Sequence, residues 1–145
     1  MNKRTLLAAL SFAPLAACGG MFAIDKWPKV DVREDEDEIR TAVIAAAKAE
    51  GFGVERVMPH LVQVSYPGKA GPEFERRHAR YQVLITGHSY LIRYMDSVGL
   101  NASRCSMGSS GWCADRTVDT WMGRLDKAIR DRLSVISRNR SLLSF

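Results

Sequence analysis

The chain has 145 residues, a formal net charge of +5 and 46% hydrophobic residues. One compact domain fits this length, and the hydrophobic content is sufficient to bury a core. No apolar run beyond residue 18 approaches the roughly 20 residues that a membrane-spanning helix needs. A basic chain can suit nucleic acid, but the secretory layout of the N-terminus argues against nucleic acid as the physiological partner.

The N-terminus has the layout of a secretory signal peptide. Lys3 and Arg4 form a short positive segment, and residues 5–16 follow as a mostly apolar run that is too short to span a bilayer. The run ends in Leu15-Ala16-Ala17-Cys18, which resembles the lipobox of bacterial lipoproteins. An ordinary secretory signal that contains a cysteine is the alternative, and the small residues directly before the cysteine favour the lipobox.

The lipobox resemblance implies a lipid anchor. Residues 1–17 would be cleaved, and Cys18 would carry palmitate and other acyl chains as the first residue of the mature chain. Multiple acyl chains are sufficient for stable membrane anchoring. Gly19, where an aspartate would favour retention in the inner membrane, predicts an outer-membrane lipoprotein that faces the periplasm.

The mature chain is predicted to begin with a tether and a helix. Residues 18–35 read as a lipid-anchored tether that holds the domain off the membrane, with glycine, Pro28 and little periodicity. An acidic run at 34–38 then precedes the Ala-rich stretch 39–50, so the run is expected to cap a helix. We prefer this cap to a calcium site because no glycine-centred loop surrounds the carboxylates. The core-facing positions of this helix would be Ile39, Val43 and Ala47.

Strands are predicted in the middle of the chain. Residues 53–58 and 61–66 are short β-prone runs separated by Pro59-His60, and residues 69–75 are expected to form a mobile loop. Two alternating runs follow, on either side of a tight turn at Gly87-His88. They predict a hairpin with one apolar face, formed by Ala79, Tyr81, Val83 and Ile85 on one strand and Tyr90, Ile92 and Tyr94 on the other.

A final helix is predicted over residues 117–137. Its apolar stripe consists of Val118, Trp121, Met122, Leu125, Ile129, Leu133 and Ile136. The result is an α+β, two-layer domain over residues 36–138, with a tail at 139–145. An antiparallel sheet of three to four strands would be covered by the N-terminal and C-terminal helices, in the order α-β-β-β-β-α.

Several segments together look like a group of small, uncharacterised proteobacterial envelope lipoproteins. They are Ala49-Glu50-Gly51-Phe52, Val83-Leu84-Ile85, residues 90–97 and the helix that bears Trp121. The resemblance covers roughly residues 36–133 and carries no activity. The chain departs from the group at Phe52, where tryptophan is expected, and in the loop between Cys105 and Cys113.

Cys105 and Cys113 are predicted to form a structural disulfide. Once Cys18 carries lipid, they are the remaining pair, and the exported compartment permits disulfides. The Gly/Ser-rich segment between them can bend back to meet disulfide geometry. A zinc or redox pair is the alternative, but a zinc site would need further ligands and no histidine is near.

Two polar surfaces are candidate binding regions. Asp96 and Ser97 end the last predicted strand beside Tyr94, where they would either cap a turn or line a small polar pocket. A basic cluster precedes the hairpin and consists of Arg76, Arg77, His78 and Arg80. It would meet an anionic envelope polymer or lipid, or serve as a solvated surface. On the last helix, the pairs Asp126–Arg130 and Lys127–Asp131 indicate a solvated face.

Residue patterns for catalysis are weak. Gly87-His88-Ser89 lacks the second glycine of a nucleophile elbow. The three histidines have no ligand-spaced partners and are expected to be singly exposed, so we predict no metal site and no cofactor. The sequence therefore favours a non-enzymatic structural or adaptor lipoprotein that binds an envelope protein through a sheet edge or through Trp112. A binding module for a small ligand, lipid or cell-wall fragment is the alternative.

Overall fold

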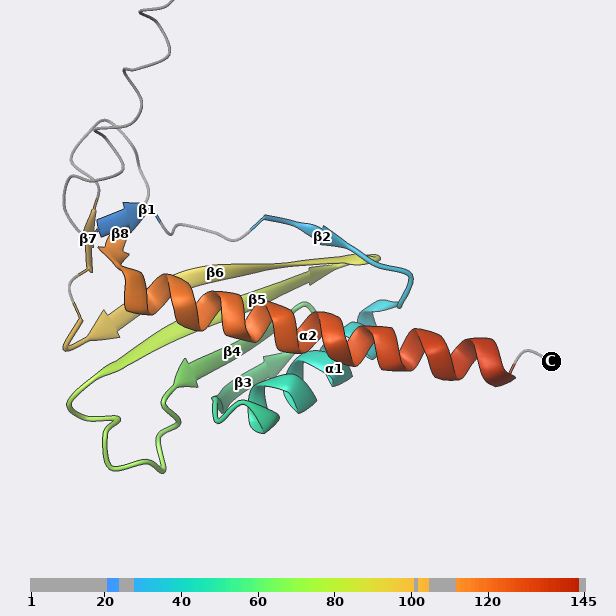
Figure 1. Ribbon diagram of the computed structural model, residues 1–145, viewed down its shortest axis with the longest axis horizontal. Helices are drawn as coiled ribbons and strands as arrows, with labels where there is room; N and C mark the ends of the chain where they lie inside the picture. The colour runs from blue at the N-terminus through green and yellow to red at the C-terminus, as the bar shows by residue number, and fades with distance from the viewer. Residues whose placement is uncertain (1–20, 24–27, 101, 105–111, 144–145) are drawn as a thin grey trace, which may run out of the picture.

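The computed structural model describes residues 21–23, 28–100, 102–104 and 112–143. They form an α+β domain in which two helices cover one face of a five-stranded antiparallel sheet (Figure 1). The elements are β1 (Met21–Ala23), β2 (Val30–Asp31), α1 (Glu36–Ala49), β3 (Gly53–Met58), β4 (Leu61–Tyr66), β5 (His78–Thr86), β6 (Ser89–Val98), β7 (Ala102–Arg104), β8 (Trp112–Asp115) and α2 (Arg116–Leu143). None of the described helices is long and apolar enough to cross a membrane.

The main sheet has the strand order β2-β6-β5-β4-β3. Strands β3 and β4 have the predicted bounds because Pro59-His60 and Pro67 end the two apolar runs. Gly87 adopts a φ of +59° in the turn between β5 and β6, a conformation open to a residue without a Cβ atom. The predicted apolar face of this hairpin is buried under the helices and consists of Ala79, Tyr81, Val83, Ile85, Tyr90, Ile92 and Tyr94.

Helix α1 begins with a capping box, as the acidic run predicted. The side chain of Asp35 accepts a hydrogen bond from the backbone N–H of Glu38 at 2.9 Å, and the Glu38 carboxylate accepts one from the backbone N–H of Asp35. These bonds satisfy backbone donors that a helix leaves unpaired in its first turn. The three predicted core positions of this helix, Ile39, Val43 and Ala47, are fully buried.

Helix α2 lies beside α1 over the sheet and extends beyond its predicted end, through Leu143 (Figure 1). Its predicted apolar stripe is buried from Val118 to Leu133, and Ile136 at the far end is partly buried. The hydroxyl of Tyr81 on β5 donates to the carbonyl oxygen of Val118 at 3.0 Å. This bond ties the start of α2 to the middle of the sheet.

The pair Asp126–Arg130 differs from the solvated pair that the helix pattern indicated. Asp126 is buried, and its carboxylate accepts hydrogen bonds from Tyr90 Oη and from Arg130 Nε, both at 2.8 Å. Burial and the hydrogen bond to Asp126 raise the pKa of Tyr90. Only Arg130 reaches the solvent, because Tyr90 on β6 approaches Asp126 from the sheet. The other pair, Lys127–Asp131, is exposed as predicted.

Two stretches of the expected tether are strands. Residues 21–23 form β1, which pairs with β8 in a separate three-stranded sheet of order β1-β8-β7. Val30 and Asp31 form β2, which pairs with the start of β6, and Val30 is buried there. A two-residue strand is too short to show an alternating pattern in the sequence. Its pairing with β6 is visible only in the tertiary structure.

Candidate functional site

The predicted pocket of Tyr94, Asp96 and Ser97 is not assembled. Strand β6 continues to Val98, so Asp96 and Ser97 lie within a strand and point to opposite faces. Tyr94 Oη and Ser97 Oγ lie 2.7 Å apart. Asp96 instead faces Arg80 across the strand pair, and neither of the two polar side chains caps a turn.

Arg80 is neutralised on the face of the sheet that lies away from the helices. Its guanidinium donates to both carboxylate oxygens of Asp96, at 2.7 and 2.6 Å. The hydrogen bond with Asp96 raises the pKa of Arg80. Of the predicted basic cluster, Arg80 is therefore already occupied by a protein carboxylate and is a poor site for an external anion.

Arg76 and Arg77 are the exposed members of the predicted basic cluster. They line a groove of about 300 Å³ together with Glu73 and Gly99. Neither arginine forms an ion pair with a carboxylate in the part of the chain that the structure describes. The guanidinium of Arg77 lies 5.6 Å from the ring centroid of Trp121, a distance typical of a cation–π contact.

Gly99 brings the end of β6 against the backbone of Arg76. It has a φ of +70°, and a Cβ atom at this position would lie 2.1 Å from the Arg76 carbonyl oxygen. Only glycine meets both conditions without strain. The predicted mobile loop also has internal structure, since residues 68–77 form consecutive hydrogen-bonded turns.

An aromatic cluster at the edge of the core was not predicted; Phe52 and Trp121 are buried in it, and Tyr66 is partly buried. The ring centroid of Tyr66 lies 4.9 Å from that of Phe52 and 4.8 Å from that of Trp121. Arg124 covers Tyr66 at 4.6 Å and donates to the carbonyl oxygen of Glu50 at 2.8 Å. The cluster joins the end of α1, the end of β4 and the first turns of α2, and its arginine is held by those contacts.

The sequence predicted that all three histidines are singly exposed, and this prediction is wrong for His78. His78 is buried, stacks on Phe74 with ring centroids 3.9 Å apart, and donates through Nδ1 to the Phe74 carbonyl oxygen. His60 pairs with Glu36 near the surface. Among the described residues, no group of three histidine, cysteine, aspartate or glutamate side chains is placed to hold a metal ion.

The side chains of the elbow-like segment Gly87-His88-Ser89 bond to backbone carbonyl groups. His88 Nδ1 donates to the Glu34 carbonyl oxygen at 2.9 Å, and Ser89 Oγ donates to the Thr86 carbonyl oxygen at 2.8 Å. A nucleophile needs its hydroxyl hydrogen-bonded to a general base. Here the hydroxyl and the imidazole are directed to separate carbonyl groups of the hairpin turn and its neighbour.

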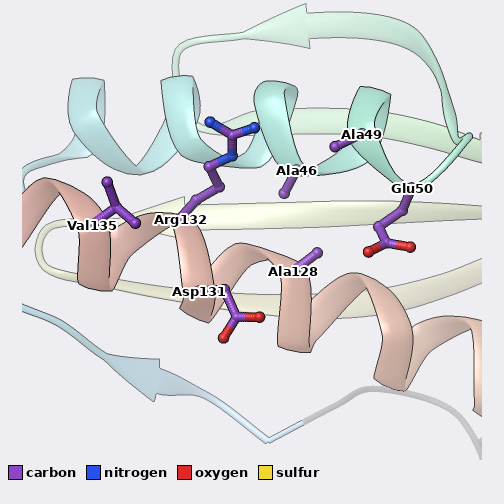
Figure 2. Close-up of a pocket in the computed structure, with 7 residues that line it drawn as sticks. All are labelled: Ala46, Ala49, Glu50, Ala128, Asp131, Arg132 and Val135. Carbon is purple, nitrogen blue, oxygen red and sulfur yellow. The ribbon is translucent and has the colours of Figure 1, made fainter.

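A second groove, of about 220 Å³, lies between α1 and α2 (Figure 2). It is lined by Ala46, Ala49, Glu50, Ala128, Asp131, Arg132 and Val135. Figure 2 shows the guanidinium of Arg132 turned toward α1 and the carboxylate of Asp131 turned away from it. The small alanine side chains explain the hollow, and the charged groups do not converge on one point within it.

Strand β3 forms one edge of the main sheet and pairs with β4 on its inner side; β2 forms the other edge. Val57 and Met58 at the end of this strand are 48% and 41% exposed, and as neighbours on a strand they point to opposite faces of the sheet edge. A bulge next to Glu55 interrupts the strand pairing before them. Among the described residues, the end of β3 that follows the bulge is one of three places with exposed large apolar side chains; the others are Val98 at the end of β6 and the last turns of α2, with Val135, Leu142 and Leu143.

Four of the predicted residues, Cys18, Cys105, Trp112 and Cys113, lie in segments that the structure describes only in part or not at all. Trp112 and Cys113 are in β8, and the backbone positions alone are described there. Cys105 and Cys18 lie outside the described residues, so the disulfide and the lipid anchor stay predictions.

No protein-family model matches this chain, and no curated protein matches it either.

Proposed function

We propose that the chain is a lipid-anchored envelope protein that acts as a non-catalytic docking module for another envelope protein. The observation that carries this proposal is the exposed apolar end of β3, formed by Val57 and Met58. Sheet edges present unpaired backbone groups, and proteins bind extended segments of their partners at such edges. The two side chains add apolar contact area to those backbone groups.

The lipid anchor rests on Leu15-Ala16-Ala17-Cys18 at the end of a short apolar run. Acylation of Cys18 would hold the domain at the membrane, in the outer membrane facing the periplasm if the residue after the cysteine directs sorting. The resemblance to small proteobacterial envelope lipoproteins agrees with this placement. A docking module held in this way would bring its partner to the membrane surface.

The alternative, a binding module for a small ligand, would require a concave site with converging polar groups. The groove beside Arg76 and Arg77 is one described groove with charged groups in its lining. It is open to solvent, and its two arginines are exposed.

Site-specific crosslinking in cells tests the docking surface. A photoreactive amino acid replaces Val57 in one strain and Val135 in another; Val135 is 45% exposed on α2 and serves as the matched control. We expect one discrete protein adduct from position 57 and none from position 135. The adduct should disappear when Met58→Lys places a charge at the same edge. Equal adducts from both positions, or persistence in the Met58→Lys strain, would contradict docking at β3.

Metabolic labelling tests the anchor separately. Cys18→Ser should abolish incorporation of labelled palmitate, and the wild-type protein should fractionate with the outer membrane. Unchanged labelling of the variant would rule out acylation at Cys18, and recovery in the inner membrane would contradict the predicted destination.

A further inference from the structure

The path from the predicted anchor to the folded domain is short. Cys18 precedes Met21 by three residues, and Met21 is already paired with Asp115 in the β1–β8 ladder. An extended chain spans at most about 3.3–3.6 Å per residue, so three residues reach no more than about 11 Å. If Cys18 is acylated, as proposed above, the domain lies against the membrane and not at the end of a long tether.

The elements that meet β1 define which end of the domain is near the membrane. Strand β8 leads directly into α2 at Arg116, and β7 begins three residues after Gly99 at the end of β6. Figure 1 shows β1, β7 and β8 gathered with the start of α2 and the end of β6, opposite the C-terminus. Helix α2 has 28 residues, so at 1.5 Å per residue it extends about 42 Å away from this end.

The described side chains at this end suit a membrane interface. Val98, the last residue of β6, is a large apolar residue that is 47% exposed. Beside it, Gly99 packs against Arg76, and the exposed Arg76 and Arg77 lack a carboxylate partner among the described residues. Among the described residues that line their groove, Glu73 is the acidic one. An apolar side chain flanked by basic ones matches the boundary between acyl chains and anionic headgroups.

We propose that this end of the domain, formed by Val98, Arg76 and Arg77, rests on the membrane that holds the lipid anchor. Val98 contacts the boundary of the acyl chains, and the two guanidinium groups bind phosphates of anionic phospholipids. In this orientation α2 projects away from the membrane. Strands β3 and β6 end at opposite ends of the sheet (Figure 1), since Met58 is in register with Leu61, Leu84 and Leu91 and Val98 with His78. Val57 and Met58 then lie away from the membrane, where a partner in the periplasm can reach them.

Lipid crosslinking of the mature, acylated protein tests this orientation. The protein is reconstituted in vesicles of phosphatidylcholine and phosphatidylglycerol with a photoreactive amino acid at Val98 or, as the control, at Val135. These two valines have nearly the same exposure, 47% and 45%. We expect phospholipid adducts from position 98 and only background from position 135. Equal yields from both positions, or none from position 98, would overturn the proposal.

Charge variants test the role of the arginines. Arg76→Gln/Arg77→Gln should lower the adduct yield at position 98 several-fold, as should vesicles of phosphatidylcholine alone. The matched control, Arg132→Gln/Arg138→Gln, removes the same charge from exposed positions on α2 and should leave the yield unchanged. An equal fall in both double variants would indicate a general charge effect and overturn the assignment to Arg76 and Arg77.

The two proposals fail in different ways. If Cys18 carries no acyl chains, palmitate labelling is absent, and both the anchor and the orientation that depends on it are overturned. Acylated protein that gives no lipid adduct at position 98 overturns the orientation alone. Docking at β3 is tested by protein adducts at position 57. Its outcome does not depend on the acylation of Cys18 or on lipid adducts at position 98.

Discussion

Replacement of Asp126 by alanine should destabilise the domain by about 1–4 kcal/mol. Its carboxylate joins Tyr90 on β6 to Arg130 on α2 and is only 9% exposed. The variant leaves the buried Tyr90 hydroxyl without this acceptor, which costs about 1–3 kcal/mol. Arg130 is 54% exposed and can be hydrated, so loss of the ion pair adds only about 0–1 kcal/mol.

The assay is urea unfolding followed by far-UV circular dichroism. Asp131→Ala is the matched control, because Asp131 also pairs with a basic residue four positions away on α2, Lys127, but both side chains are exposed. It should cost at most about 0.5 kcal/mol. If Asp126→Ala costs no more than Asp131→Ala, the buried network does not hold α2 on the sheet.

A double-mutant cycle isolates the contribution of the Tyr90–Asp126 hydrogen bond to the free energy of unfolding from that of side-chain packing. In the Tyr90→Phe background the hydroxyl is absent, so Asp126→Ala should cost about 1 kcal/mol less than in the wild type. An unchanged cost in that background would show that the hydrogen bond between Tyr90 and Asp126 contributes nothing measurable to the free energy of unfolding.

Four further outcomes can be measured on the same protein. Asp35→Ala, which removes the capping box, should lower the free energy of unfolding by about 1 kcal/mol, whereas Asp37→Ala, at an exposed residue of the same helical turn, should have a smaller effect. Gly99→Ala should destabilise more than Gly87→Ala in urea unfolding: both glycines have positive φ, but only at Gly99 would the added Cβ meet backbone, and equal losses would refute the clash with Arg76. Above about pH 10 the unfolded chain ionises its tyrosines. The raised pKa keeps folded Tyr90 protonated, so the unfolded state binds fewer protons and stability falls as the pH rises. Tyr90→Phe should make that fall less steep in unfolding measured as a function of pH. Finally, mass analysis of the exported protein without reductant should show two hydrogens fewer than the free thiols of Cys105 and Cys113 require, and alkylation of both cysteines would contradict the disulfide.

Local sequence determined the elements whose limits depend on neighbouring residues. The bounds of β3 and β4 follow from Pro59-His60 and Pro67, which end the apolar runs on either side. The N-terminus of α1 follows from Asp35 and Glu38, three residues apart in one capping box. In each case the groups that satisfy the backbone lie within a few residues, so the pattern alone is informative.

The candidate site was predictable only in part. Arg76 and Arg77 stood out as a basic pair, and the structure leaves both exposed. Arg80 stood out equally, but a carboxylate sixteen residues later neutralises it. The exposed apolar end of β3 had no signal of its own, because a strand's place at the centre or the edge of a sheet is not encoded in its own residues.

Only the tertiary structure decided the partners of the polar side chains. Asp126 and Arg130 have the spacing of an exposed helical pair, and Tyr90, thirty-six residues away from Asp126, converts them into a buried network. Asp96 and Ser97 are adjacent in sequence, yet the strand directs them to opposite faces and different partners. Helix and strand propensities act between near neighbours. Burial and pairing depend on which distant segment packs against a residue, and that is settled only when the sheet and the two helices come together.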